Sequence, residues 1–169
     1  MARRRGHLDQ GRRSGNGGVH VINVIQRVRS ASVTVGERTI GNIESGLVIL
    51  AAIEKGDQRI AIEKCARKIA SLRIFSDSEG RMNLSIGEAE GSILAISQFT
   101  LAGSIRKGRR PSFERAEEPE RARELFDHFV ESLRAENLTV ETGEFGAMMV
   151  VSLDNDGPVT FIQNSSEVS

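Results

Sequence analysis

The residue types best suited to chemistry gather in the segment Ser97-Gln98-Phe99-Thr100, which ends an apolar stretch at residues 92–97. Such a stretch is typical of a buried strand, and polar groups that end a strand usually face a cleft lined by loops. Backbone N–H groups and the Thr100 hydroxyl in that position can hold a developing oxyanion. Taken alone the pattern is weak, because hydroxyl and amide residues at strand ends are more often structural.

A second candidate is the segment Asn155-Asp156-Gly157-Pro158-Val159-Thr160. Gly157 lets a ligand approach the backbone closely, because glycine has no Cβ. Pro158 makes a cis peptide bond possible at a modest cost. The same residues fit a plain turn between two strands, and by themselves they favour that turn.

A third candidate is a basic loop in which Arg106, Lys107, Arg109 and Arg110 place four cations in five positions, followed by Pro111. The first 20 residues hold five of the 23 basic residues and one of the 23 acidic residues, so the remainder carries 18 bases and 22 acids. A net-acidic domain is a poor general polyanion binder, and any RNA contact must come from a local basic patch. The loop fits RNA or nucleotide phosphates as well as it fits a solvated surface.

The residue inventory excludes the commonest nucleophile pairs. His7 and His20 lie near the N-terminus, and His128 lies two positions from Phe126, off the apolar stripe of a predicted helix, where we expect a solvated side chain. No histidine is therefore placed to activate a serine or cysteine. Cys65 falls on an apolar helix face, and we expect a small buried hydrophobe there.

Metal and nucleotide motifs are also missing. The chain has no Cys-x-x-Cys, no His-x-x-x-His and no phosphate-loop or dinucleotide fingerprint. The acidic pairs Glu117-Glu118 and Asp154/Asp156 are expected to be solvated loop charges. We therefore expect no metal and no other cofactor.

The chain must position these candidates with one domain. Residues 1–20 are basic and nearly free of apolar residues, so we expect a disordered basic extension rather than an RNA-binding arm. No run of about 18 apolar residues is present, which argues against a membrane partner. A single cysteine fits a reducing, cytoplasmic setting.

Residues 21–169 show the patterns of both strands and helices. A helix is expected from about residue 58, and Pro119 can open a second one at its first position. The second helix carries an apolar stripe at Ala122, Leu125, Phe126, Phe129, Val130 and Leu133. Strands are expected at 21–28, 32–35, 46–53, 73–75, 92–97, about 138–142, 148–153 and 159–163. These elements predict a single α+β domain in which mixed or antiparallel sheets form a barrel-like or layered core, with two main helices packed outside.

The candidate segments belong to a series of stretches that runs in order through nearly all of this domain. The series comprises residues 24–28, 72–75, 82–85, 97–101, 106–113, 145–147 and 155–160. From about Val24 to Ile162 the chain resembles the D-aminoacyl-tRNA deacylase family, also called D-tyrosyl-tRNA deacylase.

The resemblance implies a homodimer with active sites at the subunit interface. The Gly157-Pro158 bond is then cis, and this dipeptide enters the pocket of the partner subunit, where its carbonyls crowd the position of an L side chain. Chirality is enforced by rejecting L substrates, so many D-amino acids and achiral glycine are tolerated. Arg27 matches the arginine that braces the Gly-Pro loop; without the resemblance it fits a surface charge at a strand end.

The resemblance also assigns roles to pocket residues. Ser97, Gln98, Phe99 and Thr100 line the catalytic pocket, with the Phe99 N–H and Thr100 suited to the ester carbonyl. Phe145 and Met149 match positions near the terminal adenosine, and Arg106, Lys107, Arg109 and Arg110 are assigned to tRNA binding. No protein base is required, because a ribose hydroxyl of the terminal adenosine can help to activate water.

We therefore expect hydrolysis of D-aminoacyl-tRNA, and of Gly-tRNA, without a DNA or membrane partner. The chain departs from the family pattern in residues 1–20 and at Ala102, Gly103, Met148 and Val150. Two alternatives stay open. One is a non-catalytic RNA- or DNA-binding module that uses residues 106–110 and the N-terminal extension, and the other is a hydrolase of another acylated nucleotide.

Overall fold

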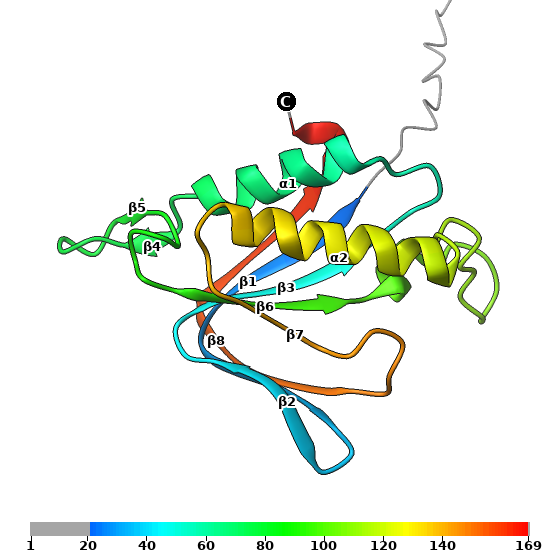
Figure 1. The fold of residues 1–169 in the computed structure, drawn as a ribbon, viewed down its shortest axis with the longest axis horizontal. Helices are drawn as coiled ribbons and strands as arrows, with labels where there is room; N and C mark the ends of the chain where they lie inside the picture. The colour runs from blue at the N-terminus through cyan, green and yellow to red at the C-terminus, as the bar shows by residue number, and fades with distance from the viewer. Residues whose placement is uncertain (1–20, 169) are drawn as a thin grey trace, which may run out of the picture.

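A six-stranded mixed sheet with two helices on one face dominates the computed structural model, which describes residues 21–168 (Figure 1). The strand order is β2-β1-β3-β6-β7, and β8 pairs with the other edge of β1. The strands of this sheet are β1 (Ile22–Val35), β2 (Arg38–Ile43), β3 (Gly46–Ala52), β6 (Ser92–Ser97), β7 (Val140–Thr142) and β8 (Val150–Asn164). The predicted extension at residues 1–20 lies outside the described residues.

The sheet curls because β1 changes partner along its length. Its first half, Ile22–Val28, pairs antiparallel with β3, and its second half pairs with β2 from Ala31 onward. The curl brings β2 back over β6 and β7, so close that a Cβ at Gly41 would lie 2.9 Å from the Thr142 carbonyl oxygen. The sheet is thus nearly closed, and the predicted α+β domain with a barrel-like core and two outer helices is confirmed.

The helices α1 (Arg59–Ser71) and α2 (Pro119–Ala135) lie side by side over the sheet (Figure 1). Both start near their predicted positions, and Pro119 opens α2 because a proline at the first helical position loses no hydrogen bond. Helix α1 buries Ile62, Cys65, Ala66 and Ile69 against the sheet. Burial raises the pKa of the Cys65 thiol to about 11, so this cysteine is a core residue, as predicted.

The sequence of β3 is continuously apolar because both faces of the strand are buried. Leu47 and Ile49 belong to the core beneath the helices, whereas Val48 belongs to a second core inside the curled sheet, with Val28, Val33, Leu94 and Ile96. Successive side chains of a strand point to opposite faces, and both faces of β3 are covered. Its parallel neighbour β6 is buried in the same way, which fixes the strand end that carries Ser97.

The prediction of two separate strands at 148–153 and 159–163 was wrong. Residues 150–153 and 159–163 belong to the single strand β8, which pairs with β1 from Thr34↔Val150 to Ile22↔Asn164 and has register shifts near its middle. The interpretation of Gly157-Pro158 as a turn between strands was therefore also wrong. The predicted strands at 21–28 and 32–35 are likewise one strand, because partners on both sides carry the pairing past the exposed residues Arg29 and Ser30.

Two smaller predictions were also corrected. Residues 82–84, for which no strand was predicted, form the short strand β5 (Met82–Leu84), which pairs with β4 (Phe75–Ser76). His128 is not a solvated surface residue: its Nε2 lies 3.0 Å from Glu63 Oε1 on α1, and its side chain is 21% exposed. His128, beside the apolar stripe of α2, therefore faces helix α1. Among the described residues, no helix is long and apolar enough to cross a membrane.

Candidate active site

A cavity of about 360 Å³ lies where β6 ends. Six residues that were predicted to form the pocket line its wall. The rest of the wall is formed by residues 53, 96, 117, 122, 146–148 and 151. The six are Ser97, Gln98, Phe99, Thr100, Phe145 and Met149. The structure thus brings two segments almost 50 positions apart in the sequence into one site.

The chain leaves β6 with a tight turn that points its polar groups into this cavity. The Gln98 N–H donates to the Ala51 carbonyl over 2.8 Å, and residues Phe99–Ala102 then form the short 3-10 helix η1. The first N–H groups of a helix have no partner within the helix. Those of Phe99 and Thr100 are therefore suited to hold a ligand oxygen.

The Thr100 hydroxyl is oriented by its neighbour. Gln98 Nε2 donates a hydrogen bond to Thr100 Oγ1. Because the hydroxyl oxygen accepts from Gln98, its proton is left to donate elsewhere. Two backbone N–H groups and one oriented hydroxyl can together stabilise an oxyanion without any charged side chain.

The opposite wall is apolar and rigidly held. The Phe145 ring packs against Phe126 at a centroid distance of 6.3 Å, and the Arg123 guanidinium carbon lies 4.9 Å from the Phe145 centroid. Met149 reaches the wall past Gly143, where a Cβ would lie 2.6 Å from the Met149 sulfur. Such a flat aromatic wall suits stacking against a planar ring.

Glu117 also lines the cavity, and the prediction that it is a solvated loop charge was wrong. Its N–H donates to the Ile53 carbonyl over 3.1 Å, which draws the segment before α2 to the edge of the chain that continues β3. This pairing joins residues 64 positions apart, so no local pattern in the sequence signals it. Its neighbour Glu118 stays exposed, with Lys55 Nζ at 3.7 Å.

Gly157 and Pro158 lie in a bulge of β8, outside the wall of this cavity. The register passes from Gln26↔Thr160 to Val28↔Asn155, so residues 156–159 stand opposite Arg27 alone. The Gly157-Pro158 peptide bond is cis, and Gly157 has a φ of 122°, which favours glycine. Both residues are exposed.

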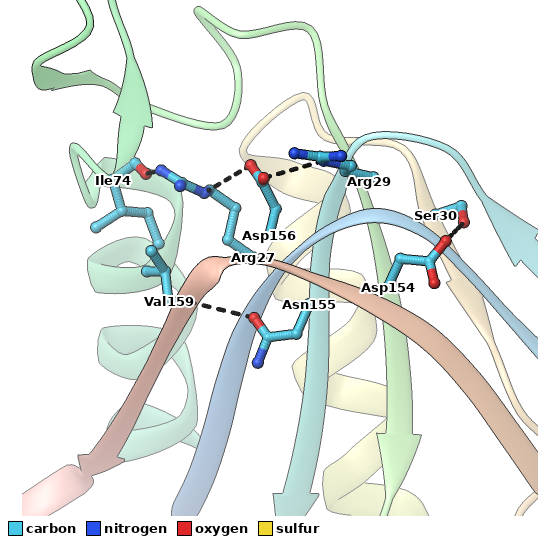
Figure 2. Close-up of polar contacts among 8 residues, drawn as sticks. All are labelled: Arg27, Arg29, Ser30, Ile74, Asp154, Asn155, Asp156 and Val159. Carbon is cyan, nitrogen blue, oxygen red and sulfur yellow. Dashed lines mark hydrogen bonds and ion pairs between the residues drawn. The ribbon is translucent and has the colours of Figure 1, made fainter.

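Buried and charged groups hold this bulge in place (Figure 2). Arg27 Nη1 donates to the Ile74 carbonyl over 2.6 Å, and Arg27 Nε lies 3.2 Å from an Asp156 carboxylate oxygen. Arg29 pairs with the other Asp156 oxygen at 3.1 Å, and Asn155 Oδ1 accepts the Val159 N–H. Arg27 is in the middle of β1 and its side chain is only 10% exposed, so the interpretation as a surface charge at a strand end was wrong.

Asp154 and Asp156, both expected to be solvated loop charges, lie on strand β8, and only Asp154 is exposed. Asp156 is half-buried between Arg27 and Arg29, whereas Asp154 is exposed and accepts a hydrogen bond from Ser30 (Figure 2). Two arginines therefore compensate the one carboxylate next to Gly157. The bulge is therefore a defined irregularity of strand β8, held by specific hydrogen bonds and ion pairs.

The basic loop projects from the cavity end of the molecule. Two hydrogen bonds between Ser104 and Ser112, of 2.7 and 2.9 Å, close it into a hairpin. Its cations, Arg106, Lys107, Arg109 and Arg110, are all exposed. They do not line the cavity, but Phe113 at the base of the hairpin contacts the Phe99 ring at a centroid distance of 5.1 Å.

The unusual Gly103 has a role in this connection. A Cβ at Gly103 would lie 2.8 Å from the Phe113 ring, so glycine allows Phe113 to reach Phe99. The basic hairpin is thereby coupled to the cavity wall. Across residues 21–168, no three His, Cys, Asp or Glu side chains gather in a way that could hold a metal ion.

Comparison with known proteins decides the family. A family model described as D-Tyr-tRNA(Tyr) deacylase matches residues 24–164. The chain belongs to this family. It is 54% identical over 145 residues to the D-aminoacyl-tRNA deacylase of Persephonella marina, covering 86% of this chain and 98% of the relative. The corresponding protein of Aquifex aeolicus is 49% identical over 145 residues, with the same coverage of 86% and 98%.

Solved structures give the same family fold. A structure titled c-Myc DNA Unwinding Element Binding Protein has a TM-score of 0.79 and 39% identity, covering 84% of this chain and 97% of its own. A probable eukaryotic D-amino acid tRNA deacylase has a TM-score of 0.75 over 86% of this chain and 99% of its own. Its 17% identity supports the fold alone. The resemblance found in the sequence is confirmed.

Proposed function

We propose that this chain hydrolyses the ester bond of D-aminoacyl-tRNA and releases a D-amino acid and free tRNA. The observation that carries the proposal is the cavity at the end of β6, where unpaired N–H groups and an oriented hydroxyl face an apolar aromatic wall. The family and the names of the relatives supply the substrate class. A reducing cytoplasmic setting suits both this substrate and the buried thiol of Cys65.

The chemistry follows from the groups in the cavity. Water adds to the ester carbonyl carbon, and the carbonyl oxygen becomes an oxyanion held by the N–H groups of Phe99 and Thr100 and by the Thr100 hydroxyl. Collapse of the tetrahedral intermediate breaks the bond to the ribose oxygen, which takes up a proton. A neighbouring ribose hydroxyl relays the proton lost by water, so no protein base is needed.

The apolar wall holds the terminal adenosine in this scheme. Phe145 offers a flat ring fixed by Phe126 and Arg123, and Met149 adds a polarizable side chain beside it. The basic hairpin at Arg106, Lys107, Arg109 and Arg110 contacts the tRNA backbone, because its exposed cations project next to the same cavity. The catalytic domain is residues 21–169, and residues 1–20 are an extension that is not needed for hydrolysis.

The Gly157-Pro158 bulge acts on the partner subunit of a homodimer. Three observations support this: the bulge is exposed, it is held by Arg27 and Asp156, and it is absent from the cavity of its own chain. Apolar side chains that a partner could cover lie along or beside β8 at Met148, Val150, Phe161 and Ile162. In the partner cavity, the bulge carbonyls crowd the position of an L side chain, while D substrates and glycine fit.

Three charged tRNAs test the proposal side by side. D-Tyr-tRNA and Gly-tRNA should be hydrolysed, and L-Tyr-tRNA should remain intact. Equal hydrolysis of the D and L esters contradicts chiral rejection. Intact D-Tyr-tRNA contradicts the activity itself.

A second candidate function is binding of nucleic acid without catalysis. It is favoured by the name of the 39% identical structure, which refers to a DNA element, and by the exposed basic hairpin. A mobility-shift titration with duplex DNA and uncharged tRNA, run beside the deacylation assay, separates the two. Tight DNA binding with intact D-Tyr-tRNA favours the second candidate. Cleavage of other acylated nucleotides, with D-Tyr-tRNA left intact, indicates a different hydrolase.

A further inference from the structure

Glu117 is the one charged side chain among the described residues that line the cavity. The other polar side chains there, Ser97, Gln98 and Thr100, are neutral, and the rest of the wall is apolar or glycine. A single charge in an otherwise neutral pocket has a strong effect on which ligands bind, because the apolar walls reduce solvent screening.

The backbone fixes Glu117 close to the reacting end of the cavity. At the end of β3, the Ala51 carbonyl accepts the Gln98 N–H over 2.8 Å. Two residues further along the same edge, the Ile53 carbonyl accepts the Glu117 N–H over 3.1 Å. Positions two residues apart along an extended strand are separated by about 7 Å. The Glu117 backbone therefore lies roughly 7 Å from that of Gln98, and both residues line the cavity.

The Glu117 carboxylate is oriented but not neutralised. Its Oε1 accepts the Glu118 N–H over 2.9 Å at the start of α2. The cations nearest to Glu117 in the sequence are engaged elsewhere: Arg115 pairs with Glu54 at 3.2 Å and Arg121 with Glu124 at 2.6 Å. Lys55 pairs with the neighbouring Glu118 at 3.7 Å. Within residues 21–168, no cation lies within ion-pair distance of Glu117.

An aminoacyl-tRNA carries a cation that matches this position. Its α-ammonium group is two bonds from the ester carbonyl carbon in every aminoacyl ester, whereas side chains vary in length and charge. If the N–H groups of Phe99 and Thr100 bind the ester carbonyl oxygen, the α-nitrogen lies in the adjacent part of the same cavity, which Glu117 also lines.

We propose that Glu117 binds the α-ammonium group of the substrate and so selects esters whose amino group is free. This inference rests on the proposed deacylase activity. Peptidyl-tRNA and other N-acylated esters have a neutral amide nitrogen at this position, which cannot form the ion pair and adds bulk. Glu117 would therefore protect them from hydrolysis, in addition to the chiral selection at Gly157-Pro158.

The test compares Glu117→Gln with the wild-type protein on D-Tyr-tRNA and N-acetyl-D-Tyr-tRNA. The variant keeps the size of the side chain and an acceptor for the Glu118 N–H. Loss of a hydrogen-bonded charge pair should lower kcat/KM for D-Tyr-tRNA about tenfold. The value for N-acetyl-D-Tyr-tRNA should stay unchanged, so the preference for the free amine falls about tenfold. Glu118→Gln, the exposed neighbour, is the matched control and should keep both values.

Each other result overturns the inference. An equal fall on both esters makes Glu117 a structural part of the wall, and unchanged values on both remove it from substrate binding. A thermal melt of each variant identifies a loss caused by misfolding, which would lower both esters together. Wild-type protein that leaves both esters intact contradicts the deacylase proposal and this inference with it; wild-type protein that cleaves D-Tyr-tRNA while Glu117→Gln keeps its preference contradicts this inference alone.

Discussion

The cavity and the Gly157-Pro158 bulge are assembled in opposite ways. The cavity collects residues from the ends of β3 and β6, the segment before α2 and the stretch 145–151 of one chain. The bulge stands on β8 against Arg27 and Ile74 and contributes nothing to that wall (Figure 2). Both are firmly held, yet in our proposal they complete each other only between two copies of the chain. A single fold can thus carry two halves of a site that it cannot join by itself.

The two regions also treat their acidic residues differently. Asp156, beside the bulge, has two arginine partners. Near the cavity, by contrast, Glu117 has no cation within ion-pair distance in the described part of the chain, and Asp57 is buried beside Glu54. Charge at the bulge serves to fix the backbone. The Glu117 charge in the cavity wall is left without an ion-pair partner among residues 21–168, as expected where a cationic ligand group binds.

The largest expected effect is at the bulge. A Cβ in Gly157→Ala would lie 2.7 Å from a Val159 methyl and 3.2 Å from Arg27 Nη2, at a φ of 122°. Displacing the bulge carbonyls by about 1 Å should lower kcat/KM for D-Tyr-tRNA about 100-fold.

Gly80→Ala is the matched control for that variant. Gly80 also has a positive φ, of 79°, but its Cβ would meet nothing within 4 Å. It should cause similar backbone strain and leave activity intact. Near wild-type activity of Gly157→Ala would remove the bulge from the site.

A smaller effect is expected inside the cavity. Thr100→Ala removes one of three proposed oxyanion donors, and the Phe99 and Thr100 N–H groups remain. Single-turnover hydrolysis of D-Tyr-tRNA should slow about tenfold, at the low end for loss of such a donor. An unchanged single-turnover rate would make Thr100 merely structural.

Asp156→Asn tests whether the ion pairs that hold the bulge contribute to the selectivity for D substrates. It weakens the contacts with Arg27 and Arg29 but leaves Gly157 and Pro158 in place. We expect a fall of only a few fold in D-Tyr-tRNA hydrolysis, together with measurable hydrolysis of L-Tyr-tRNA, because a looser bulge rejects L substrates less well. A ratio of D to L rates equal to that of the wild type would show that these ion pairs do not support selectivity.

The smallest expected effect concerns stability near the cavity. Burial raises the pKa of Asp57 from 3.8 to about 6, against the hydrogen bond donated by the Glu54 N–H. The folded state therefore holds this proton more tightly than the unfolded chain, so the contribution of Asp57 to stability is greatest below pH 4 and is lost as the pH rises to about 6.

Asp57→Asn removes that titration and keeps an acceptor for the Glu54 N–H. Urea unfolding should show that the variant gains stability relative to the wild type as the pH is raised from 4 to 7. A difference between the two proteins that does not change with pH would mean that Asp57 is not protonated in this range.

Local patterns were enough to predict much of the fold. The stripe from Ala122 to Leu133 and the apolar runs at 46–53 and 92–97 depend on residues close together in the chain, and the structure contains them nearly as predicted. The polar segment that ends β6 was also identified from the chain alone. Phe145 and Met149, which share its cavity, came from the family resemblance, because their own pattern fits an ordinary core.

The features of the site that were missed depend on pairing between distant segments. Residues 150–153 and 159–163 form one strand because β1 pairs with both, which the Gly-Pro dipeptide between them obscured. Glu117 lines the cavity because its N–H donates to the carbonyl of Ile53, 64 positions earlier in the sequence. The burial of Arg27 follows from contacts with Ile74 and Asp156, and the sequence shows only a charge within an apolar run.

The most direct test of a site shared between subunits mixes two variants with strongly reduced activity. Gly157→Ala keeps its cavity but has a displaced bulge, whereas the double variant Gln98→Ala/Thr100→Ala keeps its bulge but has a damaged cavity. Co-expression with different tags yields heterodimers in which one cavity meets one intact bulge. If the site forms across the interface, the mixture should recover roughly a quarter of wild-type activity on D-Tyr-tRNA, since half the dimers are mixed and each has one complete site. Purified heterodimers no more active than the two parents would contradict a site shared between subunits.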